Sequence, residues 1–236
     1  MHGALEEDRL YVATDILILT VRDGRLCLLL SRRVDPPYAG RWALPGTFIG
    51  LDESAETAAK RLLAEMLPVQ RAFLEQLFTF TDVNRDPRGR VISVAYLVVV
   101  PWERLKELMA EKDARFRCCQ IAMDGNGLSL TDDWGGALIP GDLAFDHGRI
   151  IETGILRLRG KIDYTDIGFR FLNDPRAFSL GELQTVFEAV LGEPLDSSNF
   201  RRAIMSRYEK TGRLTQTDQA GRRGRGRPAA LYRFNL

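Results

Sequence analysis

The stretch Thr47–Val69, TFIGLDESAETAAKRLLAEMLPV, decides the fold of this chain. Its apolar residues recur with the period of an α-helix, so it predicts an amphipathic helix with one buried face. Ser54 and its acidic neighbours precede the first apolar residues, as expected at a helix N-cap. An ordinary amphipathic helix satisfies the same pattern, so periodicity alone assigns no function. The apolar face consists of Ala55, Ala58, Ala59, Leu62, Leu63, Met66 and Leu67.

The spacing of charged residues in this stretch resembles the Nudix box, a pyrophosphatase signature written G-x5-E-x7-R-E-U-x-E-E-x-G-U, where U is a bulky apolar residue. Glu53, Arg61 and Glu65 fall on charged positions of that signature. Leu62 and Met66 stand where the family has metal-binding carboxylates. The remaining positions are Thr47 at the first Gly, Leu63 and Val69 at the apolar positions, and Pro68 at the last Gly.

The missing carboxylates bear on catalysis. Nudix hydrolysis requires divalent metal ions to neutralise a diphosphate and position water, and Mg2+ prefers carboxylate and phosphate oxygens. Positions 62, 65 and 66 share one helical face, where only Glu65 is acidic. Glu53 adds a second carboxylate from the preceding loop. We therefore predict at most weak Mg2+ binding, no metal cofactor, no catalytic residues and no enzyme activity.

Composition narrows the class of protein. The chain has 236 residues, enough for one large or two modest domains. It has no run of 18 apolar residues, which argues against a transmembrane helix. Its acidic N-terminus lacks the apolar region of a secretory signal, so we expect a cytoplasmic protein. Cys27, Cys118 and Cys119 have no metal-ligand spacing and indicate reduced thiols.

Charge is distributed unevenly along the chain. From Asp196 to the end there are ten basic and three acidic residues, whereas the whole chain carries a net charge of only +1. Such an asymmetry is typical of a nucleic-acid-binding end attached to an otherwise ordinary domain.

The N-terminal part predicts strands with helices on both sides of them. The fold class expected is α/β, a Nudix α/β/α sandwich over residues 8–160, followed by a winged helix-turn-helix over residues 165–236. The expected strands are Tyr11–Val21, Arg25–Arg33, Trp42–Gly46, Phe78–Asp82, Val91–Val100, Phe116–Met123 and Leu128–Leu130, and the expected helices start at Pro101 and Phe145.

The C-terminal part changes pattern. Phe178–Gly192 predicts a helix with a capping box formed by Ser179 and Glu182. Ser197–Tyr208 predicts a second helix, capped by Ser197 or Ser198, and a β-hairpin with a basic tip follows. Two helices and such a hairpin are the outline of a winged helix.

In a helix-turn-helix the second helix enters the major groove with its N-terminal residues toward the bases. Ser198, Asn199, Arg201 and Arg202 occupy that first turn, and Arg and Asn can bridge guanine and adenine edges. Arg207 and Lys210 lie further along and are expected at phosphates.

The hairpin tip, GRRGRGRP, contains Arg222, Arg223, Arg225 and Arg227. Its RGRP core matches an AT-hook, in which arginines lie in a narrow A·T minor groove of high negative potential. Solvated Arg/Gly tails have the same composition, and RNA is a further possible partner. The apolar strand pattern that follows the tip favours a DNA-binding wing.

The whole chain resembles the Nudix-related transcriptional regulators of bacteria. The resemblance rests on the box, on DVNRDPRGRVISVAY (Asp82–Tyr96), on LAFDHGRII, and on FSLGELQ…NFRR…GRPAALY. It implies homodimers that bind palindromic operators, mostly as repressors, and release them when a ligand occupies the Nudix cleft. One branch represses NAD-metabolism genes and senses ADP-ribose, and other branches sense pentose sugars.

A metal-poor cleft must neutralise phosphates with side chains, and Arg suits this task. Arg33, Arg85, Arg88 and Arg90 are the candidates, although some of them are also explained as surface arginines on turns. Glu53, Arg61 and Glu65 are expected to hold the cleft's shape through an ion pair. The residues proposed to stack on an adenine are Phe48, Phe80 and Tyr96.

Two other functions fit the same sequence. One is an active Nudix hydrolase of ADP-ribose or a similar nucleotide, with relocated metal ligands. The other is a constitutive DNA-binding protein whose Nudix domain only dimerises. The basic hairpin tip argues against a pure enzyme, because cleavage of a small diphosphate does not need it.

Overall fold

A mixed β-sheet forms the centre of the molecule. The computed structural model describes residues 9–67, 72–110, 115–125, 127–221 and 229–235. Its main sheet has the order β5-β6-β1-β2-β7-β8-β9, with β3 and β4 paired to β2 and β1. Strand β1 pairs in parallel with β6 and antiparallel with β2. The strands are β1 Tyr11–Arg22, β2 Arg25–Arg32, β3 Trp42–Ala43, β4 Gly46–Phe48, β5 Phe73–Phe80, β6 Val91–Val99, β7 Phe116–Asp124, β8 Gly127–Thr131 and β9 Ala137–Leu138.

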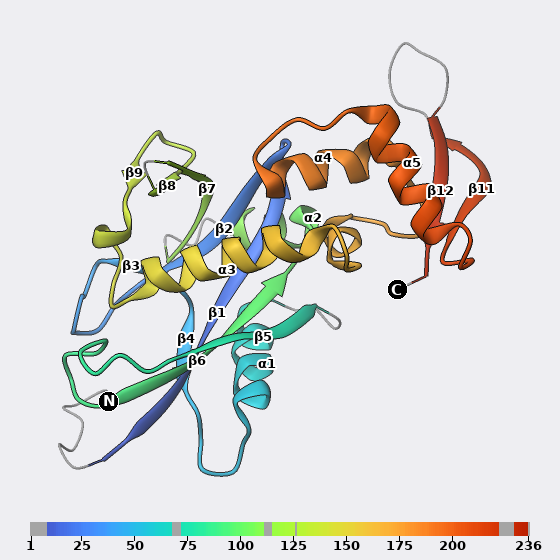
Figure 1. Ribbon diagram of the computed structural model, residues 1–236. Coiled ribbons are helices and arrows are strands. Elements are labelled where there is room, and N and C mark those ends of the chain that lie inside the picture. Colours follow the sequence, from blue (N-terminus) through green and yellow to red (C-terminus); the bar gives the residue numbers. More distant parts are fainter. Residues whose placement is uncertain (1–8, 68–71, 111–114, 126, 222–228, 236) are drawn as a thin grey trace.

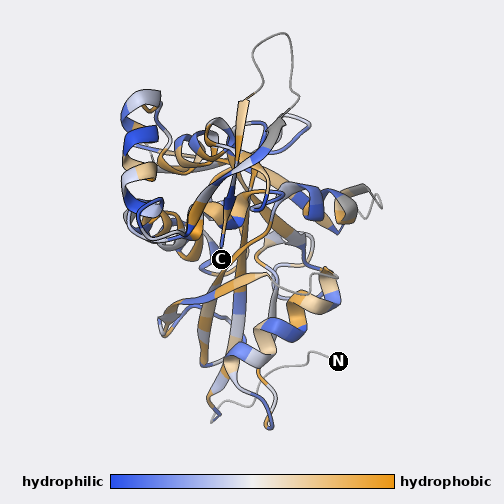
Figure 2. Ribbon diagram, turned by 90° about the vertical axis from the view of Figure 1, so that its right-hand side faces the viewer, coloured by the Kyte–Doolittle hydropathy of each residue, from blue (hydrophilic) through white to orange (hydrophobic). Residues whose placement is uncertain are grey.

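Helices cover both faces of this sheet (Figure 1). Alternate residues of β1 point to opposite sides, as a strand requires. Ile16 and Ile18 pack with helices α1 (Ala55–Met66) and α2 (Trp102–Ala110). Leu17 and Leu19 pack with α3 (His147–Ile162) and continue into the C-terminal domain. The predicted α/β/α sandwich is confirmed. The central strands are mainly apolar, whereas the helices mix hydrophilic and apolar residues (Figure 2).

The C-terminal domain is a winged helix, as predicted. Helices α4 (Leu180–Leu191) and α5 (Ser197–Tyr208) precede a hairpin of β11 (Leu214–Gly221) and β12 (Ala229–Phe234), and β10 (Phe178–Ser179) completes its sheet. The capping box at α4 forms as predicted.

An aromatic cluster holds this domain together. The ring of Phe169, in the 3-10 helix Ile167–Phe171, stacks on Phe234 at 3.7 Å. Phe178 and Tyr208 meet the ring of Phe169 edge-on.

Two predicted strand boundaries were wrong. Trp42–Gly46 divides into β3 and β4, because β3 pairs with β2 and β4 with β1. The strand expected at Phe78–Asp82 begins at Phe73 and ends at Phe80. Its early part pairs with β6 although it alternates poorly in polarity, so pairing with a neighbour overrode the local pattern.

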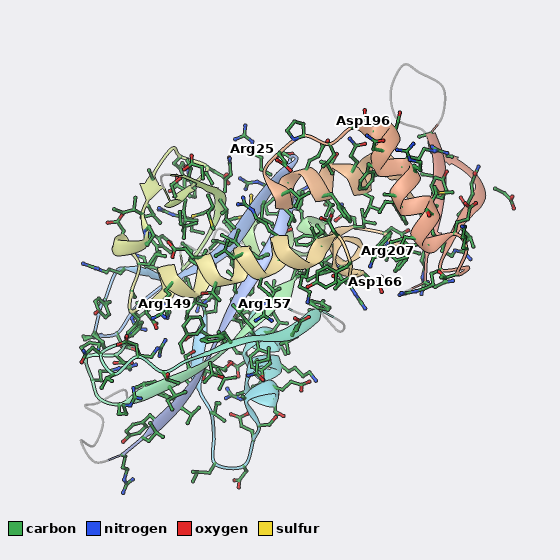
Figure 3. All side chains as sticks on the ribbon, in the orientation of Figure 1. Arg25, Arg149, Arg157, Asp166, Asp196 and Arg207 are labelled. Carbon is green, nitrogen blue, oxygen red and sulfur yellow. The ribbon has the colours of Figure 1, made fainter. Side chains whose placement is uncertain are left out.

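Polar contacts join the winged helix to the end of α3. Arg207 donates to the carbonyl of Asp163, and the hydroxyl of Tyr208 donates to the carbonyl of Thr165. Arg213 forms an ion pair with Asp166 at 2.6 Å. Figure 3 shows Arg207 and Asp166 side by side at this junction.

Candidate effector cavity and DNA-binding face

A cavity of about 120 Å3 opens where β1, β4 and the N-terminus of α3 meet. It contains the predicted effector residues Arg33, Phe48, Arg85 and Arg88. The other residues around it are Ala13, Asp15, Leu44, Gly46, Thr47, Asp86, Val91, Phe145 and His147.

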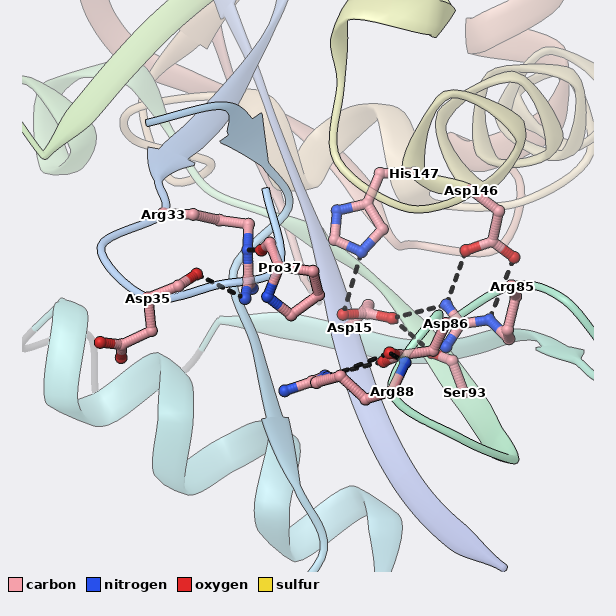
Figure 4. Close-up of polar contacts among 10 residues, drawn as sticks. All are labelled: Asp15, Arg33, Asp35, Pro37, Arg85, Asp86, Arg88, Ser93, Asp146 and His147. Carbon is pink, nitrogen blue, oxygen red and sulfur yellow. Dashed lines mark hydrogen bonds and ion pairs between the residues drawn. The ribbon is translucent and has the colours of Figure 1, made fainter. Parts of the chain in front are cut away.

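Asp15 is the centre of a buried polar network on the floor of this cavity (Figure 4). It follows Thr14 on β1, on the face that carries Leu17, and therefore points toward α3. Ser93 donates to Asp15 at 2.6 Å. Arg85, whose side chain is 3% exposed, forms ion pairs with Asp146 at 2.7 Å and with Asp15 at 3.4 Å.

Arg85 lines the cavity but is paired with two carboxylates, so we expect it to hold the cavity floor rather than to bind a phosphate directly. Burial opposes its charge, but the hydrogen bonds to Asp146 and the charge of Asp15 together raise its pKa. Because two carboxylates already neutralise this guanidinium, it has little charge left for a ligand. Removing it would leave buried carboxylates unpaired, which is costly.

His147, the first residue of α3, is a neutral imidazole. Its Nδ1 accepts a hydrogen bond from the Leu44 backbone N–H at 2.8 Å, and its Nε2 faces Asp15 at 3.5 Å. Burial lowers the pKa of His147, and this outweighs the opposing charge of Asp15. The imidazole thus anchors α3 to the strands at the cavity floor.

Arg33 and Arg88 converge on the ring of Phe145. The guanidinium carbons lie 4.6 Å and 5.5 Å from the ring centroid, and Arg88 also lies 5.3 Å from the ring of Phe48. Arg33 donates to the carbonyls of Pro37 and Asp35. Burial lowers the pKa of Arg33, and the neighbouring charge of Arg88 lowers it further. Arg88 is also paired with Asp86 at 2.7 Å, whereas Arg33 donates only to carbonyls among the described residues. Arg33 therefore carries the charge that is available to an anionic ligand.

Phe145 adopts a left-handed backbone conformation, with φ of +53°. For a residue other than glycine this costs about 1–3 kcal/mol and is held by its surroundings. A backbone of this conformation carries the ring that both arginines contact.

Thr47 and Phe48 line the cavity, whereas the charged residues of the box, Glu53, Arg61 and Glu65, lie outside its lining. Arg61 binds Glu53 at 2.7 Å and Glu65 at 3.4 Å, so the predicted ion pair is present. That pairing lowers the pKa of Glu53, and the Gly50 N–H lowers it further. Leu62 and Met66 pack against the core beside α1. This face of the helix is thus closed by apolar packing where hydrolases carry carboxylates.

Three other candidates are not at the cavity. Arg90 donates to the carbonyls of Thr81 and Asp82 and braces the turn before β6. Phe80 and Tyr96 are buried in the cores on opposite faces of the sheet, which corrects their predicted role in stacking on an adenine. Periodicity places aromatic residues in strands but does not separate a cavity wall from a core.

The cavity residues Asp15, Asp86, Phe145 and His147, and the Arg85 partner Asp146, were not predicted from the sequence. One signal was available: Asp15 is a lone carboxylate in the apolar run TDILIL, and a buried charge of this kind requires partners. LAFDHGRII was noted for its resemblance only, and nothing in its spacing showed that it faces β1.

The outer face of α5 is polar and exposed. Ser198, Asn199 and Arg202 are exposed there, together with Ser206, which was not predicted from the sequence, and Lys210 is exposed in the turn that follows the helix. Arg202 donates to Asn199 at 2.6 Å. Residues at this spacing share one side of a helix, so they form the surface that is free to enter a groove.

Two residues predicted to contact DNA donate hydrogen bonds within the protein instead. Arg201 is exposed but donates to the hydroxyl of Tyr232 on β12. Arg207 is half-buried, and its contact with Asp163 directs it toward α3. The N-cap prediction was wrong as well: the side chain of Asp196 accepts the Asn199 N–H at 2.8 Å, because α5 begins at Ser197. The hairpin-tip residues Arg222, Arg223, Arg225 and Arg227 lie outside the described residues.

No group of three or more His, Cys, Asp or Glu side chains in the described part of the chain is arranged to hold a metal ion. Within the same residues, no helix is long and apolar enough to span a membrane.

Comparison with known proteins separates the two parts of the chain. Residues 10–121 match the profile of the NUDIX domain. Residues 168–234 match that of the NrtR DNA-binding winged helix domain. An ADPR responsive transcriptional repressor, NtrR, from Acinetobacter baylyi is 32% identical over 95% of this chain and 82% of its own length.

The chain belongs to the NrtR family of transcriptional regulators. A crystal structure of Shewanella oneidensis NrtR complexed with a 27mer DNA is 32% identical, with a TM-score of 0.75, over 95% of this chain and 93% of that one. An ADP-ribose pyrophosphatase from Methanocaldococcus jannaschii is 30% identical over 63% of this chain and 77% of its own length. The similarity to NrtR regulators thus includes the winged helix.

Proposed function

We propose that this protein is a repressor that binds operator DNA through its winged helix and releases it when ADP-ribose occupies the Nudix cavity. The observation that carries the proposal is the convergence of Arg33 and Arg88 on Phe145 at that cavity. A diphosphate beside these guanidinium groups offsets the charge of Arg33 and adds charge-assisted hydrogen bonds. The A. baylyi relative is named for its response to the same nucleotide.

The cavity accommodates one portion of such a ligand. Its volume of about 120 Å3 is below the 300–1,000 Å3 or so of typical small-molecule sites. We place the diphosphate or ribose there, with Phe48 and Phe145 as apolar walls. The remainder of the nucleotide then extends across the rim.

We further propose that the domain binds the diphosphate without hydrolysing it. Leu62 and Met66 replace two carboxylates of the signature, and Glu53 and Glu65 are both paired with Arg61. The two remaining carboxylates, Glu53 and Glu65, support weak Mg2+ binding at most. Active hydrolysis remains the rival function, and the pyrophosphatase relative gives it specific support.

The DNA-binding role is assigned to the outer face of α5 and to the hairpin. Arg202 and Asn199 are the residues proposed to read bases, because they lie on the exposed first turns of α5. Lys210 and the arginines of the hairpin tip are proposed at the backbone and the minor groove. A homodimer on a palindrome is the assembly that one such helix per subunit fits, and the cytoplasm is its proposed location.

Fluorescence anisotropy of labelled operator DNA, titrated with ADP-ribose, NAD and arabinose, tests the proposal. ADP-ribose is expected to release the DNA. Release by NAD or arabinose instead would assign the effector to that compound. Incubation of the protein with ADP-ribose and Mg2+, followed by assay for AMP, tests the rival. Steady AMP formation, without any effect of ADP-ribose on operator binding, would show that the protein is an enzyme and not a sensor.

A further inference from the structure

Helix α3 connects the effector cavity to the winged helix. Its first residue, His147, contacts Asp15 at the cavity floor, and Arg159 lies near its other end. Twelve residues of α-helix separate them, a length of about 18 Å. A Cβ added at Gly154 would lie 2.2 Å from Leu17, so the helix rests directly on β1. A rigid element thus touches both sites.

Arg159 bridges the two parts of the molecule. Its Nε donates to the carbonyl of Val190, in the last turn of α4, at 3.0 Å. Its Nη1 donates to the carbonyl of Met123, near the end of β7, at 3.3 Å. The C-terminal carbonyls of a helix carry partial negative charge and favour a cation. A single guanidinium therefore binds α4 to the Nudix sheet.

The bridge contacts the start of the helix-turn-helix turn, Gly192–Asp196. Gly192 ends α4 in a left-handed conformation, with φ of +82°. A Cβ on Gly192 would lie 3.0 Å from Nη2 of Arg159, so the guanidinium lies directly beneath the turn. Because α5 follows this turn, a change in the position of Arg159 is expected to move α5.

The surroundings of Arg159 are open. It lines a cavity of about 500 Å3 that separates the tip of the β1–β2 hairpin and the end of β7 from the end of α4. The guanidinium spans this hollow, whereas the apolar core joins the two parts elsewhere. A contact of this kind can break without disruption of the core.

We propose that Arg159 is a positioning residue that transmits occupancy of the effector cavity to the DNA-binding helix. A ligand at Arg33 and Arg88 acts on the N-terminus of α3, and Arg159 carries the displacement to the turn before α5. The inference rests on the proposed function, in which ADP-ribose weakens operator binding.

The test compares Arg159→Ala with Arg157→Ala, an exposed arginine on the same helix (Figure 3). Operator affinity is measured with and without ADP-ribose, and ADP-ribose affinity is measured without DNA. In the wild type, ADP-ribose should weaken operator binding by a factor typical of allosteric proteins, about 5–150. In Arg159→Ala this factor should fall close to one, while ADP-ribose affinity stays unchanged. Arg157→Ala should behave as the wild type.

A full response in Arg159→Ala would overturn the inference. Arg159→Lys, which keeps the charge at the α4 carbonyls but cannot span both contacts as a fork, should retain part of the response, and it carries the test if Arg159→Ala does not fold. If the wild type itself ignores ADP-ribose, the proposed function fails. In that case, the operator affinities of the variants without ligand decide whether Arg159 positions α5. A loss specific to Arg159→Ala supports it, and equal affinity in both variants contradicts it.

Discussion

Neighbouring arginines at the end of β2 have different surroundings, and only one belongs to the cavity. Arg33 lines it and lies against Phe145, whereas Arg32 is exposed and donates to the carbonyl of Gly40. Arg33→Ala should weaken ADP-ribose binding about 10–100-fold, because hydrogen bonds between charged partners contribute about 1.5–3 kcal/mol. Isothermal titration calorimetry measures the change. Arg32→Ala is the matched control, and equal losses in the two variants would remove the phosphate site from this cavity.

His147 predicts how stability depends on pH. The pKa of His147 is lower in the folded protein than in the unfolded chain. The contribution of His147 to the free energy of unfolding is therefore complete above the unfolded pKa of about 6.5 and is lost as the pH falls below it. The free energy of unfolding should therefore fall between pH 7 and pH 5 more steeply in the wild type than in His147→Gln. Urea unfolding at several pH values gives both curves. Parallel curves would show that His147 is not held neutral by the fold.

At the level of single residues, the sequence predicted side-chain types better than their partners. Arg33 and Arg88 were assigned to the cavity because guanidinium groups suit phosphates, and they line it. Arg85 was assigned on the same reasoning, yet it is buried against Asp15 and Asp146. Such partners are 70 and 61 residues away in the chain. Local pattern holds no information about contacts at that separation.

At the level of elements, the cap of α5 gives a direct test. Asp196 accepts the Asn199 N–H, and Ser198 lies inside the helix. Asp196→Ala should therefore lower the free energy of unfolding by about 1 kcal/mol and weaken operator binding through fraying of the first turn. Ser198→Ala should leave stability nearly unchanged. Urea unfolding and operator anisotropy measure both effects, and the reverse order of stabilities would restore Ser198 as the cap.

Elements with a strong local signal were predicted well. The capping box of α4, the N-cap Ser54 of α1 and the β1–β2 hairpin depend on residues within a few positions of each other, and all three are present. The end of β5 and the division of β3 from β4 depend on pairing with distant strands, which no short pattern specifies. The role of α3 was hidden as well, because its helical spacing does not reveal what lies at its two ends.

At the level of the whole molecule, one apolar core extends from the Nudix sheet into the winged helix. Two domains predicted from a change of sequence pattern are thus packed together rather than tethered by a linker. The residues that replaced the Nudix carboxylates contribute to the core on the other face of the sheet. In a sensor of this construction we expect communication through packed elements, of which α3 reaches from the cavity floor to Arg159 beneath the turn.

In the proposed mechanism, the cavity and the DNA-binding helix are energetically coupled. Linkage requires that operator DNA lower the affinity for ADP-ribose by the same factor by which ADP-ribose lowers the affinity for operator. Calorimetric titration of ADP-ribose into the protein, free and saturated with operator, measures that factor directly. We predict weaker ADP-ribose binding to the operator complex, by a factor equal to the one from DNA anisotropy. Identical ADP-ribose affinities in the two titrations would contradict the account.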